Sequence, residues 1–299
     1  MTSAILVIGN LNVDIIMGPQ EPWPRPGTEV VLPHGDLRVG GAAGNTALAL
    51  QAIGTPYRLV ANRGHDVFGD WLAAAFPDQD DPMLTAAATT VSVGITHPDG
   101  ERTFFTTVGH LGQFNLACVE AQFPASVTPG ALALLSGTFV TPALTADYPK
   151  LIALLRERGF VVALDTGWPA GGWTEAVRTQ VRDWLPSCEH VLLNEMEAQG
   201  MTGVTETGAA VRSIMSSLSP NAVLVIKRGP AGALVVHGSE TLAVPAPAVT
   251  VVDTIGAGDV FNAGYLSALS RSASPQQATK GGVRLASLAV STQPRRYLT

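Results

Sequence analysis

Short apolar segments alternate with longer amphipathic segments along most of the chain. The apolar segments are typical of buried strands and cover residues 5–8, 58–61, 131–135, 161–164, 191–193 and 222–226. The longer segments have helical periodicity and cover residues 42–52, 67–76, 148–158, 174–185, 206–218, 258–270 and 275–290. Apolar strands separated by helices predict an α/β fold, with a mostly parallel central sheet that helices cover on both faces.

Two segments break this alternation and predict a second, smaller sheet. Residues 28–38 are rich in β-branched side chains, and residues 89–107 are typical of a hairpin with Pro98-Asp99-Gly100 as its turn. Each has an apolar face at period two that needs cover, and neither fits a βα unit. We predict a single domain over residues 1–299 in which these segments form a lid, which could also be a homodimer contact. The alternative is a decorated edge of the main sheet.

Composition and charge exclude several classes of protein. The chain has 299 residues, of which 46% are hydrophobic and only 14% are charged, as in a compact globular protein. The net charge is −6 and basic residues do not cluster, so we expect no nucleic-acid partner. We also expect no membrane span and a cytoplasmic location, because apolar runs are short and the first one is unlike a signal peptide. Cys118 and Cys188 predict free, buried thiols.

The segment Asp253-Thr254-Ile255-Gly256-Ala257-Gly258-Asp259 carries the strongest functional signal. It joins a strand-like run to an apolar helical pattern through a turn without large side chains. The first N–H groups of a helix lack internal partners, and the helix dipole adds about half a positive charge there, so the turn predicts an anion site. Asp259 could accept a proton beside it, which is the minimum for phosphoryl transfer to a hydroxyl. The alternative is that the glycines and Asp259 only serve the turn and the helix cap.

Other polar residues follow predicted strands, at the edge where parallel sheets bind ligands. Asn12 and Asp14 point the same way in an extended backbone and could grip neighbouring hydroxyls of a polyol, although an Asx-turn also explains them. Gly40 and Gly41 precede the next helix with almost no side-chain bulk and leave Asn45 as a polar contact. Tight helix packing is the alternative explanation for these small residues.

Two further clusters suggest nucleotide and metal binding. Asn194 and Glu197 would share a face at the start of a helix, where their oxygens could hold hydrated Mg²⁺, form a capping box, or do both. Lys227, Gly229 and Gly232 follow the strand at 222–226 and could line a nucleotide, although a turn into the next strand also explains the glycines. The chain lacks the P-loop, Gly-x-Ser-x-Gly and His-Glu-x-x-His motifs, so P-loop kinases, α/β-hydrolases and zincins lose support.

In their order along the chain, these residues resemble the ribokinase-like carbohydrate kinases, the phosphofructokinase-B group. The C-terminal signature Asp-Thr-x-Gly-Ala-Gly-Asp is complete at residues 253–259. The other matching motifs are Asn-x-Asp at 12–14, Gly-Gly at 40–41 with Asn45, Gly-Glu-Arg-Thr at 100–103 and Asn-x-x-Glu at 194–197. The resemblance implies a ribokinase-like fold with a small β-sheet lid, and ATP-dependent phosphorylation of a hydroxyl on a small sugar or sugar-like alcohol.

The resemblance also implies a role for each matching residue. Asp259 would be the catalytic base, and the anion hole would be formed by the N–H groups of Gly256, Ala257 and Gly258. The sugar would be held by Asn12, Asp14, Gly40, Gly41 and Asn45. The nucleotide would be bound by Asn194, Lys227, Gly229, Gly232 and Thr254. Glu197 would act on Mg²⁺ through water, and Asp253 belongs to a loop where a monovalent cation such as K⁺ could bind.

Two departures from the ribokinase pattern concern the substrate. Ala42 stands where ribokinases carry a lysine, and residues 136–139 offer no carboxylate after the strand at 131–135. Both changes remove polar contacts, so we predict a sugar kinase for which ribose is a poor substrate. One alternative is a nucleoside kinase, with Phe104 and Phe105 facing the base. Another is a non-catalytic sugar-binding protein, against which the intact Asp259 argues.

Overall fold

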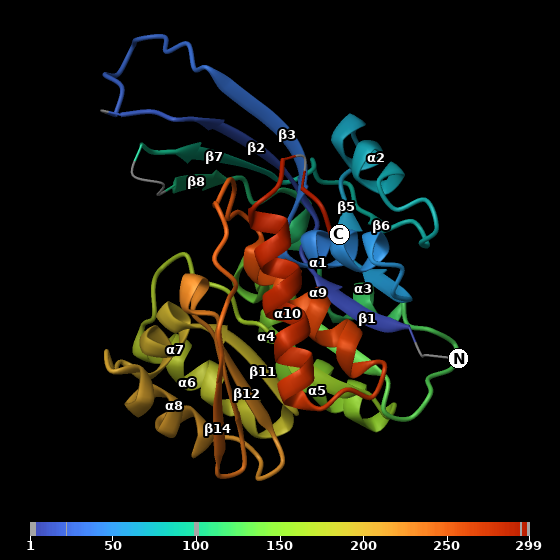
Figure 1. Ribbon diagram of the computed structural model, residues 1–299. Helices are drawn as coiled ribbons and strands as arrows, with labels where there is room; N and C mark the ends of the chain where they lie inside the picture. Colours follow the sequence, from blue (N-terminus) through green and yellow to red (C-terminus); the bar gives the residue numbers. More distant parts are fainter. Residues whose placement is uncertain (1–3, 22, 99–101, 294, 298–299) are drawn as a thin grey trace.

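The computed structural model describes residues 4–21, 23–98, 102–293 and 295–297. Its centre is an eight-stranded sheet with the strand order β14-β13-β12-β11-β10-β9-β1-β4 (Figure 1). The strands are β1 (Ile5–Gly9), β4 (Tyr57–Val60), β9 (Leu132–Ser136), β10 (Val161–Leu164), β11 (His190–Asn194), β12 (Val223–Lys227), β13 (Ala233–His237) and β14 (Glu240–Val244). Neighbours from β4 to β12 pair in parallel, whereas β13 and β14 continue the sheet antiparallel.

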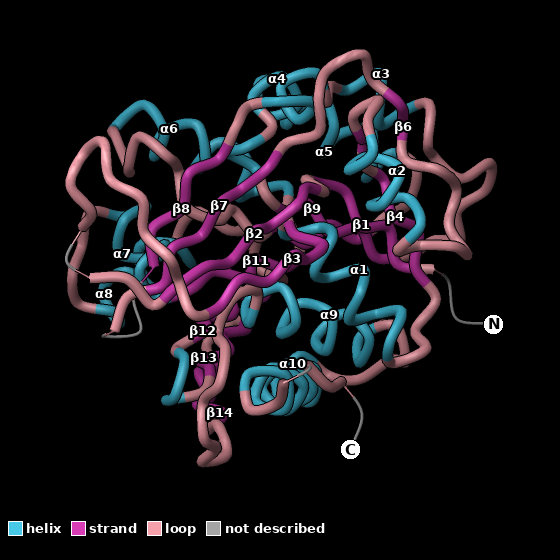
Figure 2. Tube along the Cα trace, turned by 90° about the horizontal axis from the view of Figure 1, so that it is seen from above, coloured by secondary structure: helices cyan, strands magenta, loops and turns pink. Residues whose placement is uncertain are grey.

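Helices cover both faces of the central sheet because successive strand residues point to opposite sides. Ile5 and Val7 of β1 join one core, with α1 (Ala42–Ala52), α2 (Val67–Ala74), α9 (Ala257–Leu269) and α10 (Pro275–Val290). Leu6 and Ile8 join the core on the other face, with α3 (Leu116–Glu120), α4 (Pro142–Ala146), α5 (Tyr148–Glu157), α6 (Glu175–Trp184), α7 (Glu195–Thr202) and α8 (Thr207–Met215). Figure 2 shows α9 and α10 lying together on their face of the sheet.

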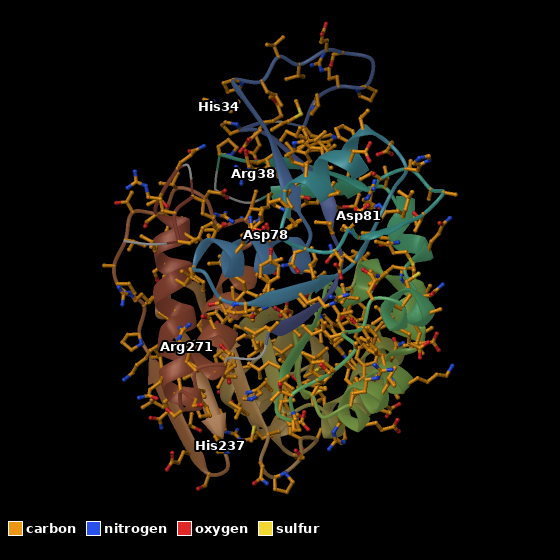
Figure 3. All side chains as sticks on the ribbon, turned by 90° about the vertical axis from the view of Figure 1, so that its right-hand side faces the viewer. His34, Arg38, Asp78, Asp81, His237 and Arg271 are labelled. Atoms are coloured by element: carbon orange, nitrogen blue, oxygen red, sulfur yellow. The ribbon has the colours of Figure 1, made fainter. Side chains whose placement is uncertain are left out.

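A second sheet of four strands, which we call the small sheet, extends from the edge where β1 ends (Figures 1 and 2). Its order is β3 (His34–Gly40), β2 (Asn12–Gly18), β7 (Val91–Thr96) and β8 (Arg102–Thr106). Figure 3 shows Arg38 near the base of β3 and His34 further from the body of the molecule. A short pair, β5 (Asn62–Arg63) and β6 (Met83–Leu84), forms a third, two-stranded sheet.

The predicted fold class is confirmed, and the predicted strands and helices of the central body end within three residues of the observed ones. Four features of the sheets differ from expectation. β2, the β5–β6 pair and the β13–β14 hairpin were not predicted, and residues 28–33 lie outside any strand. Val30 and Val31 in that segment are exposed, so their β-branched side chains have no neighbouring strand to pack against. The predicted turn residues Asp99 and Gly100 lie outside the described residues.

Cys118 and Cys188 are both buried and unpaired, as predicted. Among the helices of the described residues, none is long and apolar enough to cross a membrane.

Candidate active site

Four of the five predicted substrate residues, all except Gly40, meet Asp259 in one pocket between the small sheet and the start of α9. The pocket has a volume of about 320 Å³ and is lined by Asn10, Asn12, Asp14, Gly41, Ala42, Asn45, Ser92, Arg102, Phe104, Thr106, Ile255, Gly256 and Asp259. Most of these residues offer polar atoms, which suits a ligand with several hydroxyl groups. A second hollow of about 230 Å³ lies between the β13–β14 hairpin and α10 and contains none of these residues.

Asn12 and Asp14 lie on the same face of β2, where a chain of hydrogen bonds orients them. The Asn12 Nδ2 donates to Asp14 Oδ1 at 2.7 Å and to Ser92 Oγ at 3.3 Å, and Asn10 Nδ2 donates to Asn12 Oδ1 at 3.0 Å. The extended backbone of β2 confirms their shared orientation and excludes an Asx-turn. Among the described residues, the second Asp14 oxygen has no hydrogen-bond partner, so it is available to a ligand. Burial raises the pKa of Asp14 to about 6, although the Asn12 amide and Arg38 lower it.

Gly40 and Gly41 are required by the close approach of the chain to these side chains. A Cβ on Gly40 would lie 2.1 Å from Asp14 Cγ, and one on Gly41 would lie 2.3 Å from the carbonyl oxygen of Asn10. Gly41 also has φ 85°, a conformation that favours glycine. These contacts explain why the glycines stand together, and they place Asn45 on the first turn of α1, facing the pocket.

Asp259 is bound to α1 from both its side chain and its backbone. Asn45 Nδ2 donates to Asp259 Oδ2 at 3.0 Å, and the Thr46 hydroxyl donates to the Asp259 carbonyl oxygen at 3.2 Å. Burial raises the pKa of Asp259 to about 8, and the carboxylate of Asp165 raises it further, whereas Asn45 and Lys227 lower it. A carboxylate with a pKa near neutral pH is matched to work as a general base.

The turn before α9 presents unpaired N–H groups beside Asp259, and we call residues 254–258 the anion turn. Gly256 has φ 71°, and no side chain caps the helix. The Ala257 N–H donates to the Thr254 carbonyl at 3.1 Å, so this predicted donor is used within the turn. In the part of the chain that the structure describes, the N–H groups of Gly256, Gly258 and Asp259 have no partner. With the helix dipole, these groups make the positive end at which anions bind.

The loop that leads into the anion turn is bound by three arginines from other parts of the chain. The Asp253 carboxylate accepts hydrogen bonds from Arg38, from Arg295 at 3.2 Å and from the Ile255 N–H at 2.9 Å. Arg102 of β8 donates to the Thr254 hydroxyl. The small sheet, through Arg38 and Arg102, and the segment after α10 therefore both contact this loop. A monovalent cation near Asp253 remains a prediction, at a carboxylate that two guanidinium groups already neutralise.

Asn194 and Glu197 form the predicted capping box at the start of α7. The Glu197 N–H donates to Asn194 Oδ1, and the Asn194 N–H donates to Glu197 Oε2, both at 2.8 Å. Burial and the carboxylate of Asp165 raise the pKa of Glu197, against the effect of Lys227. Among the described residues, no group of three or more His, Cys, Asp and Glu side chains could hold a metal ion. A binding site with few protein ligands and several waters is typical of Mg²⁺, so the predicted role of Glu197 through water is compatible with this geometry.

The three residues predicted near the nucleotide lie at the end of β12 and in the turn that follows. Lys227 is paired in register with Asn194, so both stand at the carboxyl edge of the sheet. Gly229 begins the turn and has open space where a side chain would stand. A Cβ on Gly232 would lie 2.0 Å from the Val244 carbonyl, so the β13–β14 hairpin requires this glycine. Nucleotide binding by all three, and by Thr254, remains a prediction.

The sequence reasoning missed several residues in the pocket and one, Asp165, that lies beside it without lining it. Asn10 and Asp165 each directly follow a strand, so the position rule that identified Asp14 could have found them. Ser92 and Thr106 enter the pocket because β7 pairs with β8, and no local pattern marked them. Phe104 lines the pocket as the nucleoside alternative requires, whereas the Phe105 ring packs against Trp23 with centroids 5.8 Å apart.

Comparison with known proteins agrees with this arrangement. The family described as pfkB family carbohydrate kinase matches residues 2–296. Fructokinase-1 of Zea mays is 25% identical over 249 residues, which cover 81% of this chain and 76% of that protein. A Vibrio cholerae O395 fructokinase structure with fructose, ADP and calcium has a TM-score of 0.79 at 22% identity, covering 98% of this chain and 94% of its own. An Arabidopsis thaliana ribokinase structure with ribose and ATP has a TM-score of 0.76, also at 22% identity and with coverage of 98% and 94%. These structures show that the fold is ribokinase-like, and the chain belongs to the pfkB family of carbohydrate kinases.

Proposed function

We propose that this protein is an ATP-dependent kinase of a small sugar or sugar-like alcohol. The observation that carries the proposal is the position of Asp259. Its carboxylate lies beside the unpaired N–H groups of Gly256 and Gly258, in the pocket that Asn12 and Asp14 line. A proton acceptor, an anion site and hydroxyl-binding groups are thus combined in one cavity, as phosphoryl transfer to a hydroxyl requires.

The proposed reaction follows from these positions. Asp14 and Asn12 orient one substrate hydroxyl toward Asp259. That hydroxyl attacks the γ-phosphorus of ATP in line, the bond from the γ-phosphorus to the bridging oxygen breaks, and ADP leaves. Asp259 accepts the hydroxyl proton, a contribution typically of about 10²–10⁴-fold in rate. The N–H groups of the anion turn stabilise the charge on the transferring group.

The nucleotide and metal assignments rest on the carboxyl edge of the sheet and on relatives. The fructokinase of Vibrio cholerae binds ADP with calcium, and the ribokinase of Arabidopsis thaliana binds ATP. Here Asn194, Lys227 and Thr254 would face the nucleotide, and Glu197 would hold Mg²⁺ through water. Mg²⁺ would neutralise charge on the phosphate oxygens.

Glu197→Gln should raise the Mg²⁺ concentration that gives half-maximal activity and should barely change Tm. Glutamine can keep the hydrogen bond to the Asn194 N–H, and even a complete cap contributes only about 1 kcal/mol. Initial rates across a Mg²⁺ titration and thermal melts measure the two effects. Glu206→Gln is the matched control, because Glu206 caps α8 and does not line the pocket. A lower Tm with an unchanged Mg²⁺ response would show that Glu197 only caps the helix.

The specificity prediction concerns residues 42 and 136–139. Ala42 lines the pocket, but none of residues 136–139 does, and the Thr138 hydroxyl instead bonds to Tyr148 OH at 3.1 Å in the core. A site discriminates strongly only where an unmatched polar group would be left unpaired, so a pocket lacking these contacts should not favour ribose.

A substrate panel tests both the kinase function and the specificity. ATP consumption should be measured with pentoses, hexoses, sugar acids and nucleosides. We expect a ketose, a modified sugar or a nucleoside to exceed ribose, and Phe104 makes a nucleoside the second candidate. Ribose as the best substrate by tenfold or more would overturn the specificity argument, and the absence of turnover with every acceptor would overturn the kinase function.

We also propose that the small sheet acts as a lid. It supplies Asp14, Ser92 and Phe104 to the pocket and contacts the anion-turn loop through Arg38 and Arg102. Amide hydrogen exchange in residues 34–40 and 91–96 should therefore slow when the best substrate is added. The β13–β14 hairpin, remote from the pocket, is the internal control. Unchanged exchange at saturating substrate would contradict the lid.

We propose that the predicted homodimer forms through the outer side of the small sheet, which carries Leu37 and Phe105 and faces away from Asp14. Trp23, Leu37 and Phe105 are all exposed there or beside it. A protein whose mass in solution by light scattering is that of one chain, with and without substrate, would rule the homodimer out.

A further inference from the structure

A buried lysine and a buried aspartate pair beside the proposed active site without lining its pocket. Asp165 follows β10 and Lys227 ends β12, so the lysine side chain crosses the end of β11 to reach the aspartate. The Lys227 Nζ lies 2.7 Å from Asp165 Oδ2, and the two side chains are only 12% and 8% exposed. The kinase mechanism proposed above gives Asp165 no role.

Asn262 of α9 closes this pair into a ring of three residues. Its Nδ2 donates to Asp165 Oδ2 at 2.5 Å, and its Oδ1 accepts from Lys227 Nζ at 3.4 Å. Asn262 is fully buried and lies one turn beyond Asp259 on the same helix. The ring therefore connects the ends of two central strands to the helix that carries the proposed base.

The ring places the lysine ammonium against the anion turn. The Lys227 Nζ lies 3.4 Å from the position that a Cβ on Gly258 would occupy. An ammonium has three N–H donors, and among the described residues only Asp165 and Asn262 accept from this one. One donor is therefore free next to the N–H groups that would receive the phosphoryl group.

The charge of Lys227 is maintained by its carboxylate neighbours. Burial lowers the pKa of Lys227, but Asp165 and Glu197 outweigh this effect, so the pKa lies above its ordinary value and the group stays protonated. Asp165 and Lys227 act on Asp259 in opposite directions, since Asp165 raises and Lys227 lowers the pKa of that carboxyl. Asp14 of β2 also raises it, and Tyr297 faces Asp259 from the C-terminal segment.

Stability alone is a poor explanation for the ring. Two buried charges lose their hydration, and apolar residues of similar volume often stabilise a fold equally well or better. Apolar residues could not supply a fixed positive charge between the anion turn and a cluster of carboxylates. The ring is therefore better explained by the chemistry of the pocket.

We propose that Asp165 and Asn262 are positioning residues that hold the Lys227 ammonium against the anion turn, where its positive charge acts on the Asp259 carboxyl and faces the transferring phosphoryl group. The assignment of the phosphoryl contact rests on the proposed kinase function, whereas the control of Asp259 does not. Lys227 acts directly, and Asp165 acts through Lys227 and through its own negative charge.

The pH dependence of kcat/KM in three variants tests the proposal. kcat/KM should fall at low pH as Asp259 becomes protonated, and we call this part of the profile the acidic limb. Lys227→Met should move the acidic limb to higher pH by about one unit or more, because a charge within a few ångströms shifts a carboxyl pKa by about that much. Asp165→Asn should move the limb downward, since it removes a negative charge beside Asp259. Lys227→Arg keeps the charge and should stay closer to the wild type than Lys227→Met does. Lys150→Met, at an exposed lysine of α5, is the matched control and should leave the limb in place.

A second measurement is independent of turnover. The Asp259 carboxyl can be titrated by ¹³C NMR in the full chain, with Asp259→Asn to assign the signal, and the same opposite shifts are expected. Variants that lower Tm but leave both the limb and the titration unmoved would overturn the proposal. If Lys227→Met does not fold, the near-isosteric Asp165→Asn provides the test. A downward shift of the acidic limb and of the Asp259 titration would support the proposal, and no shift in either would overturn it. A wild-type protein without kinase activity would disprove the proposed function, and the NMR titration would still decide whether the ring controls Asp259.

Discussion

Asp259→Asn should lower kcat by about 100-fold or more while the sugar still binds. The amide cannot accept the hydroxyl proton, but it can keep the contact with Asn45 that now joins α1 to α9 at 3.0 Å. Steady-state kinetics and sugar binding by calorimetry measure the two quantities separately. Asp183→Asn, at an exposed aspartate of α6, is the control and should change neither. Near-normal kcat in Asp259→Asn would show that another group is the base.

The same substitution should stabilise the protein near neutral pH. The folded-state pKa of Asp259 is raised from 3.8 to about 8, so the native state holds a proton there that the unfolded state releases. Stability is therefore lost as the pH rises from the unfolded value toward the folded value, and an amide avoids that loss. We expect Asp259→Asn to raise Tm by about 2–4 °C at pH 8, as about 1 kcal/mol would, and by less at pH 5. A Tm of Asp259→Asn below that of the wild type at pH 8 would show that the surrounding groups stabilise the ionised Asp259 carboxylate.

The strands and helices of the central body could be predicted because each follows from the hydrophobic pattern of its own residues. Strands such as Ile5–Gly9 are buried on both sides and are therefore apolar almost without interruption, while helices such as α5 keep a polar face. The Gly40-Gly41 pair could be recognised as a close approach of the chain, but the residues that require it, Asp14 and Asn10, are distant in sequence. The position of Asp14 followed from its place just beyond a strand.

The rest depends on contacts between distant residues, which single positions do not encode. Arg38 meets Asp253 across 215 residues, and Lys227 meets Asp165 across 62, and nothing in the local sequence of either partner indicates the other. β2 was missed because Asn12 and Asp14 are polar, although their burial against Ser92 and Asn10 makes them regular strand residues. Strand formation there is decided by the neighbouring strands β3 and β7 more than by intrinsic preference.

Asp14→Ala should remove most of kcat/KM for whichever substrate is best, a loss of about 100-fold or more. Asn12 holds one Asp14 oxygen at 2.7 Å, and the backbone of Gly40 packs against the carboxyl group, so the free oxygen has a fixed direction. Alanine would leave the attacking hydroxyl without that orienting contact, and a displacement of about 1 Å from the line of attack can cost about 100-fold.

Melting temperatures and a second substitution at Asp14 separate a loss of hydroxyl orientation from a loss of folding. Asp14 is buried with a pKa raised to about 6, so its removal should not lower Tm at neutral pH by the amount that losing a favourable ion pair would. Asp78→Ala is the control, because Asp78 is exposed on the outside of the molecule (Figure 3). Asp14→Asn should lose less activity than Asp14→Ala, since an amide can still bind a hydroxyl. Equal losses in both variants with unchanged Tm would indicate that the negative charge of Asp14, and not its hydrogen bond, acts on the hydroxyl. Retention of wild-type kcat/KM in Asp14→Ala would place the attacking hydroxyl elsewhere in the pocket, beyond the reach of β2.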